Sequence, residues 1–153
     1  MSTVRFGGQW TEEKLEILRA YLNAYTTALK NQPFTLTYVD AFAGPGSYSV
    51  ARDDYAAFHE FRSGSPMIAL KIEDKPFDKL VFIEQDAKAA GSLMTLSNSY
   101  RERKIKVLQE DANDEIPKFC NEMGRYDRAV VFLDPFATEV AWSTVEALSL
   151  IHI

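Results

Sequence analysis

Thr37-Tyr-Val-Asp-Ala-Phe-Ala-Gly-Pro-Gly-Ser47 joins an apolar run to a turn that is rich in glycine. The run, residues 34–39, has the β-branched and aromatic composition of a strand, and Asp40 follows it. Gly44 and Gly46 come directly afterwards. Parallel α/β domains bind ligands where their strands end, and glycines let the backbone approach the ligand. The stretch therefore predicts an α/β domain with a ligand site after its first strand.

The rest of the chain alternates between strand-like and helix-like segments. Apolar runs typical of buried strands recur at 80–83, 105–108 and 129–133. Segments with helical spacing of apolar residues lie at 11–31, 66–72, 86–98, 112–123 and from 141 onward. This alternation predicts an α/β fold, with a parallel sheet, helices on both faces and right-handed crossovers. With four strands, we expect one sheet edge and some apolar surface to stay uncovered.

Residues 47–63 separate the glycine turn from the next predicted helix and show no clean period. A loop of this length is uncommon unless it has a function or moves. Two interpretations stay open: the segment covers the site, or it is a solvated insertion with a short helix. Ser63-Gly-Ser-Pro66 then predicts a helix start, with Ser65 as N-cap and Pro66 in the first helical position.

Length and composition limit the classes of protein. The 153 residues suit one domain, and the net charge of −5 disfavours tight, non-specific binding of nucleic acid. The single cysteine, Cys120, cannot form an internal disulfide and is expected to be a buried thiol, which fits a cytoplasmic protein. No run approaches the ~20 apolar residues of a membrane span, and the N-terminus has no signal-peptide pattern. We therefore expect no membrane association. The chain also shows no His/Cys ligand cluster, so we expect no metal site.

Four acidic residues lie at or just after the ends of the four predicted strands: Asp40, Glu84, Asp111 and Asp134. The carboxyl ends of parallel strands meet at one edge of a sheet, where such folds bind ligands. We therefore predict one shared site rather than four unrelated loop acids. Two narrower alternatives stay open: Glu84 as a solvated loop acid, and Asp111 as the N-cap of the helix at 112.

The positions of these acids suit a nucleoside ligand. Glu84 follows the second strand, where an acid commonly accepts hydrogen bonds from both ribose hydroxyls. Asp111 could accept one from an adenine amino group, and Asp40 with the Gly44–Gly46 backbone would contact the rest of the ligand. A dinucleotide needs a Gly-x-Gly-x-x-Gly turn that leads directly into a helix. Here the third glycine is absent and the next helix starts near Ser65. We therefore predict S-adenosylmethionine, which has no phosphate, as the cofactor.

Asp40-Ala-Phe-Ala-Gly-Pro-Gly46 resembles the first motif of class I S-adenosylmethionine-dependent methyltransferases. Glu84 matches their ribose-binding acid, and Asp111-Ala-Asn113 matches their adenine-contact position. Asp134-Pro-Phe136 resembles the fourth motif of the amino-methyltransferases that act on nucleobases. Nearly the whole chain up to Ala147 is similar to the three-Cys-motif partner protein family (TcmP) of bacteria and phages. This similarity rests on Lys14-Leu-Glu-Ile-Leu-Arg19, Tyr38-Val-Asp-Ala-Phe-Ala-Gly44, Gly64-Ser-Pro-Met-Ile-Ala-Leu70, Val81-Phe-Ile-Glu84, and Val131-Phe-Leu-Asp-Pro-Phe136 with Trp142-Ser-Thr144.

The resemblance implies a Rossmann-like class I methyltransferase sheet that binds S-adenosylmethionine through Asp40, Phe42, Gly44, Gly46, Glu84, Asp111 and Ala112. It also implies methyl transfer to an amino group, with a nucleic-acid base as one acceptor class and a three-Cys-motif protein as partner. Asp134 would accept hydrogen bonds from the target amine, and Phe136 would stack on the target base. The fourth motif has one proline instead of two. This departure leaves open that Asp134 caps a turn and that Phe136 is a core residue.

The last six residues, Leu-Ser-Leu-Ile-His-Ile at 148–153, follow a helical pattern without a cap and read like a translated sequencing-adapter oligonucleotide. We expect residues 1–147 to be the N-terminal portion of one methyltransferase domain and 148–153 to be a non-native tail. Such a portion is expected to be inactive by itself. Two other functions stay open: a non-catalytic module of the same fold that binds the partner protein, and a nicotinamide oxidoreductase, which the glycine turn disfavours.

Overall fold

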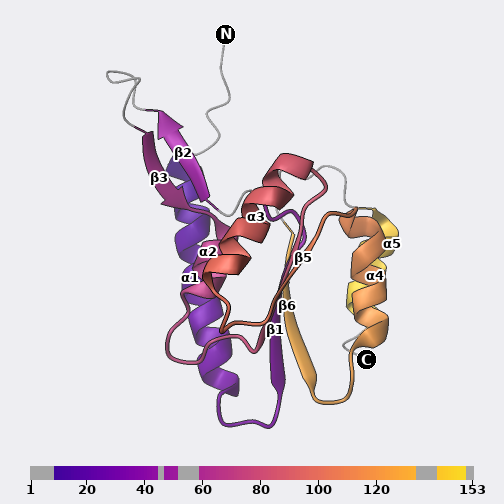
Figure 1. The fold of residues 1–153 in the computed structure, drawn as a ribbon. Helices are drawn as coiled ribbons and strands as arrows, with labels where there is room; N and C mark the ends of the chain where they lie inside the picture. The colour runs from indigo at the N-terminus through magenta and orange to yellow at the C-terminus, as the bar shows by residue number, and fades with distance from the viewer. Residues whose placement is uncertain (1–8, 45–46, 52–58, 134–140, 151–153) are drawn as a thin grey trace.

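The computed structural model describes residues 9–44, 47–51, 59–133 and 141–150. Its centre is a parallel sheet with the strand order β5-β4-β1-β6 (Figure 1). β1 is Thr35–Asp40, β4 is Lys79–Ile83, β5 is Ile105–Leu108 and β6 is Asp127–Phe132. Each strand coincides with a predicted apolar run, which confirms the predicted α/β fold with a parallel sheet. Because β1 pairs with β4 on one side and β6 on the other, the turn after β1 leaves the sheet between two neighbours.

Helices cover both faces of this sheet, as predicted. α1 (Gln9–Leu29), α2 (Ser65–Leu70) and α3 (Ala87–Ser99) pack on one face, and α4 (Ala112–Glu122) and α5 (Trp142–Leu150) pack on the other (Figure 1). Successive side chains of a strand point to opposite faces. Leu36 and Tyr38 of β1 therefore enter the core under α1, α2 and α3, whereas Val39 enters the core under α4. α1 to α4 begin and end within two residues of the predicted positions, and α5 begins within one residue of its predicted start.

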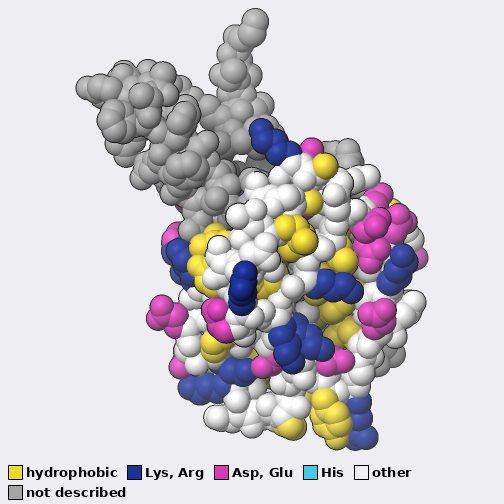
Figure 2. All heavy atoms as spheres, viewed as in Figure 1, with side chains coloured by type: hydrophobic (Ala, Val, Ile, Leu, Met, Phe, Trp, Pro, Cys, Tyr) yellow, Lys and Arg dark blue, Asp and Glu magenta, His cyan; other side chains and the backbone are white. Residues whose placement is uncertain are grey.

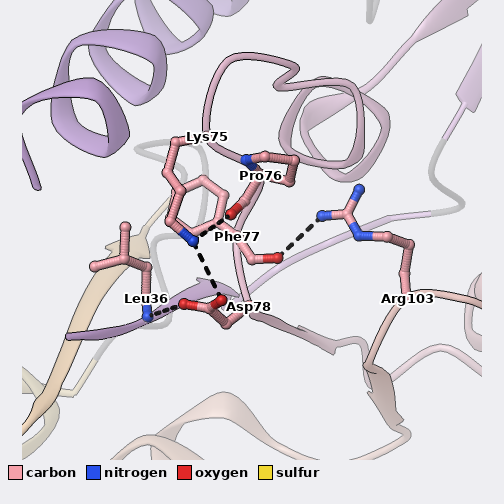
Figure 3. Close-up of polar contacts among 6 residues, drawn as sticks. All are labelled: Leu36, Lys75, Pro76, Phe77, Asp78 and Arg103. Carbon is pink, nitrogen blue, oxygen red and sulfur yellow. Dashed lines mark hydrogen bonds and ion pairs between the residues drawn. The ribbon is translucent and has the colours of Figure 1, made fainter. Parts of the chain in front are cut away.

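Side chains make hydrogen bonds to the backbone near the amino ends of β1 and β4 (Figure 3). Asp78, just before β4, accepts a hydrogen bond from the Leu36 N–H at 2.7 Å and donates its own N–H to the Leu36 carbonyl at 2.9 Å. The Arg103 guanidinium donates to the carbonyl of Leu70, at the end of α2, and to that of Phe77, at 2.9 and 3.1 Å. These bonds hold the loop between α2 and β4 on the sheet, at the end opposite to the glycine turn.

Residues 47–63 contain a β-hairpin, which the sequence did not indicate. β2 (Ser47–Ala51) pairs antiparallel with β3 (His59–Ser63), with Ser47 opposite Ser63. The hairpin projects past α1 from the carboxyl end of the main sheet (Figure 1). The predicted short helix is therefore wrong for these two stretches. Residues 47–50 do alternate polar and apolar side chains, the pattern of a half-buried strand, but His59–Ser63 does not, so the sequence offered no partner strand for them.

The β6 edge of the sheet is open within the described residues, as the four-strand prediction implied. A groove of about 920 Å³ runs along it. Its walls come from α1 on one side and from the ends of α4 and α5 on the other, and Tyr21, Tyr25, Met123 and Leu148 are among its lining residues. Tyr21 is 55% exposed, so part of the apolar surface beside β6 is uncovered.

Candidate functional site

The glycine turn after β1 is bonded to the acid at the end of β4. The Gly44 N–H donates to Glu84 Oε2 at 2.9 Å, and the neighbouring Ala43 N–H donates to the Ile83 carbonyl at 3.0 Å. The other carboxylate oxygen of Glu84 accepts the Asp86 N–H at 3.1 Å. The structure thus brings together two residues that the sequence assigned to one ligand, although they are far apart in the chain.

Gly44 supplies a backbone conformation and free space. Its φ of +64° is left-handed, and it is the only residue with positive φ among those described. A Cβ placed on it would meet nothing within 4 Å. A glycine is therefore required here by conformation and not by crowding. The open space beside the turn leaves its backbone accessible to a ligand.

Glu84 retains acceptor capacity after these bonds. A carboxylate offers about four lone-pair positions, and the two N–H groups of Gly44 and Asp86 occupy one on each oxygen. The side chain is half-buried, at the rim of the sheet. It can thus accept further bonds from hydroxyl groups such as those of a ribose. Its bonds to the Gly44 turn show that it is not the freely solvated loop acid of the alternative interpretation.

Phe42 and Ala112 contribute to one apolar cluster on the α4 side of the sheet. Ala112 is buried together with Val39 and Ile83, and Phe42 packs against this cluster while staying half-buried. The first residue of α4 and the turn after β1 are therefore close to each other. Phe42 keeps part of its apolar surface exposed next to the Gly44 turn, which suits the flat face of a nucleobase, while Ala112 is 3% exposed.

Asp111 is the N-cap of α4. Its Oδ1 accepts the Asn113 N–H at 2.9 Å, and its carbonyl accepts the N–H groups of Asp114 and Glu115. The N-cap alternative is thus confirmed. The side chain is only half-buried, and its capping bond does not use all acceptor positions, so the role toward an adenine amino group stays a prediction.

Asp40 is completely buried, unlike the other two described acids. Its Oδ2 accepts hydrogen bonds from the Tyr38 hydroxyl at 2.9 Å and from the Ser65 hydroxyl at 2.5 Å. Burial, followed by the adjacent charge of Asp40, raises the pKa of Tyr38 well above its ordinary value. Ser65 is consequently not the predicted N-cap: Gly64 holds that position, and Pro66 lies in the first turn as predicted.

Gly46, Asp134 and Phe136 lie outside the described residues, so their predicted roles stay predictions. The backbone just before Asp134 is described. Asp40 is the register partner of Phe132 at the end of β6, and the Ala41 N–H donates to the Phe132 carbonyl at 3.1 Å. The chain therefore leaves β6 beside the turn that follows β1, at the same end of the sheet as Glu84.

Two contacts near the site were not foreseen. Asn113 Oδ1 accepts the Ala141 N–H at 2.7 Å and the Thr144 hydroxyl at 2.9 Å, which ties the start of α5 to α4. No sequence signal joins segments so far apart. The Tyr38–Asp40 bond could have been found, because residues two apart on a strand share a face.

Two hollows in the described part of the chain are not lined by Gly44 or Glu84. Besides the groove along β6, a cavity of about 260 Å³ lies between α4 and the strands, lined by Val81, Leu108, Phe119 and the basic residues Lys79, Lys106 and Lys118, among others. Figure 2 shows hydrophobic side chains exposed between α3 and α4, with basic side chains beside them.

Some site types are absent from the part of the chain that the structure describes. No three His, Cys, Asp or Glu residues there are placed to hold a metal ion. No helix there is long and apolar enough to cross a membrane. Cys120 is half-buried rather than buried, and it lines the groove beside β6. Burial raises the pKa of its thiol, which makes it a poor nucleophile.

No family model and no curated protein match the chain. Among solved structures, it is similar to protein LPL1258 of Legionella pneumophila, of family DUF519, with a TM-score of 0.63 at 13% identity. That alignment covers 90% of this chain and 63% of LPL1258. The chain is also similar to "Putative methyltransferase yhhF" of Escherichia coli, at 18% identity, and to a conserved hypothetical protein of Streptococcus pyogenes, at 21%. Both have a TM-score of 0.47, and 84% of this chain aligns with 59% and 68% of theirs.

The chain spans less than two thirds of the length of LPL1258 and of yhhF. At these identities the likeness concerns the fold. Together with the strand order β5-β4-β1-β6, the likeness to LPL1258 confirms the predicted α/β fold with a Rossmann-like parallel sheet. The similarity to the three-Cys-motif partner family stays a prediction that rests on the sequence motifs.

Proposed function

We propose that this chain carries the S-adenosylmethionine site of a methyltransferase. The observation that carries the proposal is the hydrogen bond between the Gly44 N–H and the Glu84 carboxylate. It joins a left-handed glycine turn after β1 to an acid after β4, at the end of the sheet where folds of this kind bind nucleosides. Both residues have room and acceptor positions left for a ligand.

Each described residue has a part in holding the cofactor. Glu84 accepts hydrogen bonds from the two ribose hydroxyls, and the open backbone at Gly44 faces the methionine end. Asp111 accepts from the adenine amino group while it caps α4, and the exposed part of Phe42, with the buried Ala112 in the same cluster, packs against the adenine ring. No bound phosphate is needed, which agrees with a helix α2 that starts only after the hairpin.

The bound cofactor supplies a sulfonium that makes its methyl group electrophilic. The chain's own contribution is then to align the acceptor and to stabilise the positive charge that grows on it. We assign these tasks to Asp134, as acceptor of hydrogen bonds from a target amine, and to Phe136, as a stacking surface for a nucleobase. A three-Cys-motif protein is the proposed partner, and an amino group of a nucleic-acid base is the proposed acceptor.

Calorimetric titration with S-adenosylmethionine, S-adenosylhomocysteine and NADH tests the cofactor. We expect micromolar binding of the first two and none of NADH. Glu84→Gln should weaken binding by at least about tenfold, since it removes a charged acceptor and keeps the side-chain shape. Glu102→Gln, an exposed acid in the loop before β5, should bind like wild type. Preference for NADH, or unchanged affinity of Glu84→Gln, would contradict the proposal.

A second candidate function is a non-catalytic module that uses the same fold to bind the partner protein. The open β6 edge with its groove favours it, because uncovered sheet edges and exposed apolar side chains such as Tyr21 commonly mark interfaces. Asp134→Ala separates the two candidates. If the chain is a methyltransferase, we expect Asp134→Ala to abolish methyl transfer and to preserve cofactor binding. The control Asp114→Ala on α4 should preserve both. Equal transfer by Asp134→Ala and wild type would remove the role that we give to Asp134.

A further inference from the structure

We propose that Asp40 is a positioning residue whose buried carboxylate ties the start of α2 to the end of β1, and so holds the Gly44 turn against Glu84. The sequence had assigned Asp40 to direct contact with the cofactor. Its complete burial and its bonds to Tyr38 and Ser65 argue for a different task. We call the bond between the Ser65 hydroxyl and Asp40 Oδ2 the Asp40–Ser65 link.

The Asp40–Ser65 link joins the two ends of a long segment that lies outside the main sheet. Residues 41–64 leave the sheet after Asp40, form the glycine turn and the hairpin, and return at Ser65, the first residue of α2. Within this segment Ser47 pairs with Ser63, so the two strands of the hairpin bring the outgoing and returning chain side by side. The Asp40–Ser65 link, at 2.5 Å, then joins the two ends at their base.

This closure replaces a connection that other nucleotide-binding turns obtain directly. Where a helix begins immediately after the glycines, helix and turn are fixed to each other by the backbone. Here the hairpin intervenes, so α2 and the turn share the packing of the core but no direct backbone connection. The link adds a buried hydrogen bond to this packing, because Asp40 is completely buried and Ser65 is 9% exposed.

Tyr38 also donates a hydrogen bond to the buried Asp40 carboxylate. The acceptor is the same Oδ2, but Tyr38 lies on β1 itself, so this bond joins nothing to α2. The raised pKa of Tyr38 keeps its hydroxyl protonated at neutral pH, so the donor is always present. Of these two bonds to Asp40 Oδ2, the one from Ser65 joins β1 to α2, and Tyr38 also interacts with the Ser65 hydroxyl.

Amide hydrogen exchange measured by NMR can test this difference. Ser65→Ala cuts the link, whereas Tyr38→Phe removes a bond to the same oxygen and leaves the link in place. We expect Ser65→Ala to raise the exchange rates of the Ala43 and Gly44 amides about tenfold, the loss expected for one hydrogen bond to a charged group. The amide of Leu93, buried in α3, should keep its rate in Ser65→Ala. Tyr38→Phe should change Ala43 and Gly44 no more than it changes Leu93.

Two results would overturn the proposal: equal acceleration of Ala43 and Gly44 in both variants, or acceleration of all three amides together in Ser65→Ala. The first result would mean that Asp40 needs two hydrogen-bond donors but that it does not matter whether they come from β1 or from α2. The second would mean that Ser65 contributes only to the global stability of the fold. If Ser65→Ala does not fold, Ser65→Cys keeps the volume with a weaker donor and should give a smaller increase confined to Ala43 and Gly44.

The consequence for affinity rests on the proposed function and is measured separately. By calorimetry, Ser65→Ala should bind S-adenosylmethionine about tenfold more weakly, because the turn must be reordered on binding, and Tyr38→Phe should lose less than threefold. If wild type binds no S-adenosylmethionine while the exchange of Gly44 still responds to Ser65→Ala, the proposed function fails and the positioning role of Asp40 stands.

Discussion

Gly44 shows how a single residue type can be fixed by backbone conformation alone. Because its φ is +64° and no atom lies within 4 Å of a Cβ, Gly44→Ala introduces conformational strain without a clash. We expect it to lower the free energy of unfolding by about 1 kcal/mol in urea denaturation. Gly91→Ala, at an equally open position in helix α3, should raise it by about 0.5–1 kcal/mol. The same sign for both substitutions would contradict this explanation.

The raised pKa of Tyr38 predicts that the folded state loses stability at alkaline pH. Its pKa is raised in the folded state by burial and by Asp40, so the folded protein retains the hydroxyl proton when the unfolded chain loses it. Stability from this group is complete below the unfolded pKa of about 10 and falls as the pH rises above it. Tyr38→Phe should cost about 1–2 kcal/mol at pH 7, and this cost should shrink above pH 10. Urea denaturation from pH 7 to 11 measures both.

The exposed Tyr126 provides the control for this pH dependence. Its ring is 57% exposed, so Tyr126→Phe should have the same alkaline profile as wild type. A gap between Tyr38→Phe and wild type that stays constant from pH 7 to 11 would show that the ionisation of Tyr38 is not linked to folding.

Arg103 shows how an element is fixed by one side chain from elsewhere in the chain. Its guanidinium donates to the carbonyls of Leu70 and Phe77, which bracket the loop between α2 and β4 (Figure 3). Arg103→Gln cannot span both carbonyls, and we expect it to cost about 2 kcal/mol in urea denaturation. Arg101→Gln, at an exposed position in the same turn, should stay within about 0.5 kcal/mol of wild type. Similar values for both would mean that these bonds contribute no net stability.

The elements that the sequence predicted are those whose signal is local. The run at 80–83 is apolar because β4 lies inside the sheet and is largely buried, whereas β5 and β6 at the sheet edges are half-buried and still mostly apolar. The helices carry their own periodicity. The links made by Arg103 and Ser65 join segments that are far apart in the chain, so no window of sequence contains them. The hairpin strands are close in sequence, but His59–Ser63 has no strand pattern to reveal the pair. In the site, Gly44 and Glu84 were predicted to lie together, and a hydrogen bond joins them. The burial of Asp40 was missed because its partner Ser65 comes from another element.

The open edge at β6 predicts self-association of the 153-residue chain. The Tyr126 and Phe132 carbonyls accept N–H groups from the chain of β1, at 2.9 and 3.1 Å. Since bonding alternates along a parallel ladder, Ala129 directs its N–H away from β1 to the open edge. Such an edge can pair with another chain. We therefore expect association that rises with concentration in light scattering.

Ala129→Pro removes the outward N–H and should reduce this association, because proline is tolerated at edges and cannot donate. Ala129→Ser keeps the N–H and should associate like wild type. Thermal unfolding of both variants shows whether the fold survives. A monomeric wild type at all concentrations would refute the expected pairing, as would equal association of the two variants.

The position of β1 inside the sheet also has a consequence for the order of assembly. β4 and β5 follow β1 along the chain and pair in that sequence, so these three strands can form a sheet as soon as residue 108 is available. β6 must return across most of the chain to pair Asp127 with Thr35, and long closures are slow. We therefore expect the chain to build the half that holds Gly44 and Glu84 first. The segment that follows β6 and carries Asp134 would then join a sheet that has already formed. Under the proposed function, the nascent chain would complete its cofactor site before its site for the methyl acceptor.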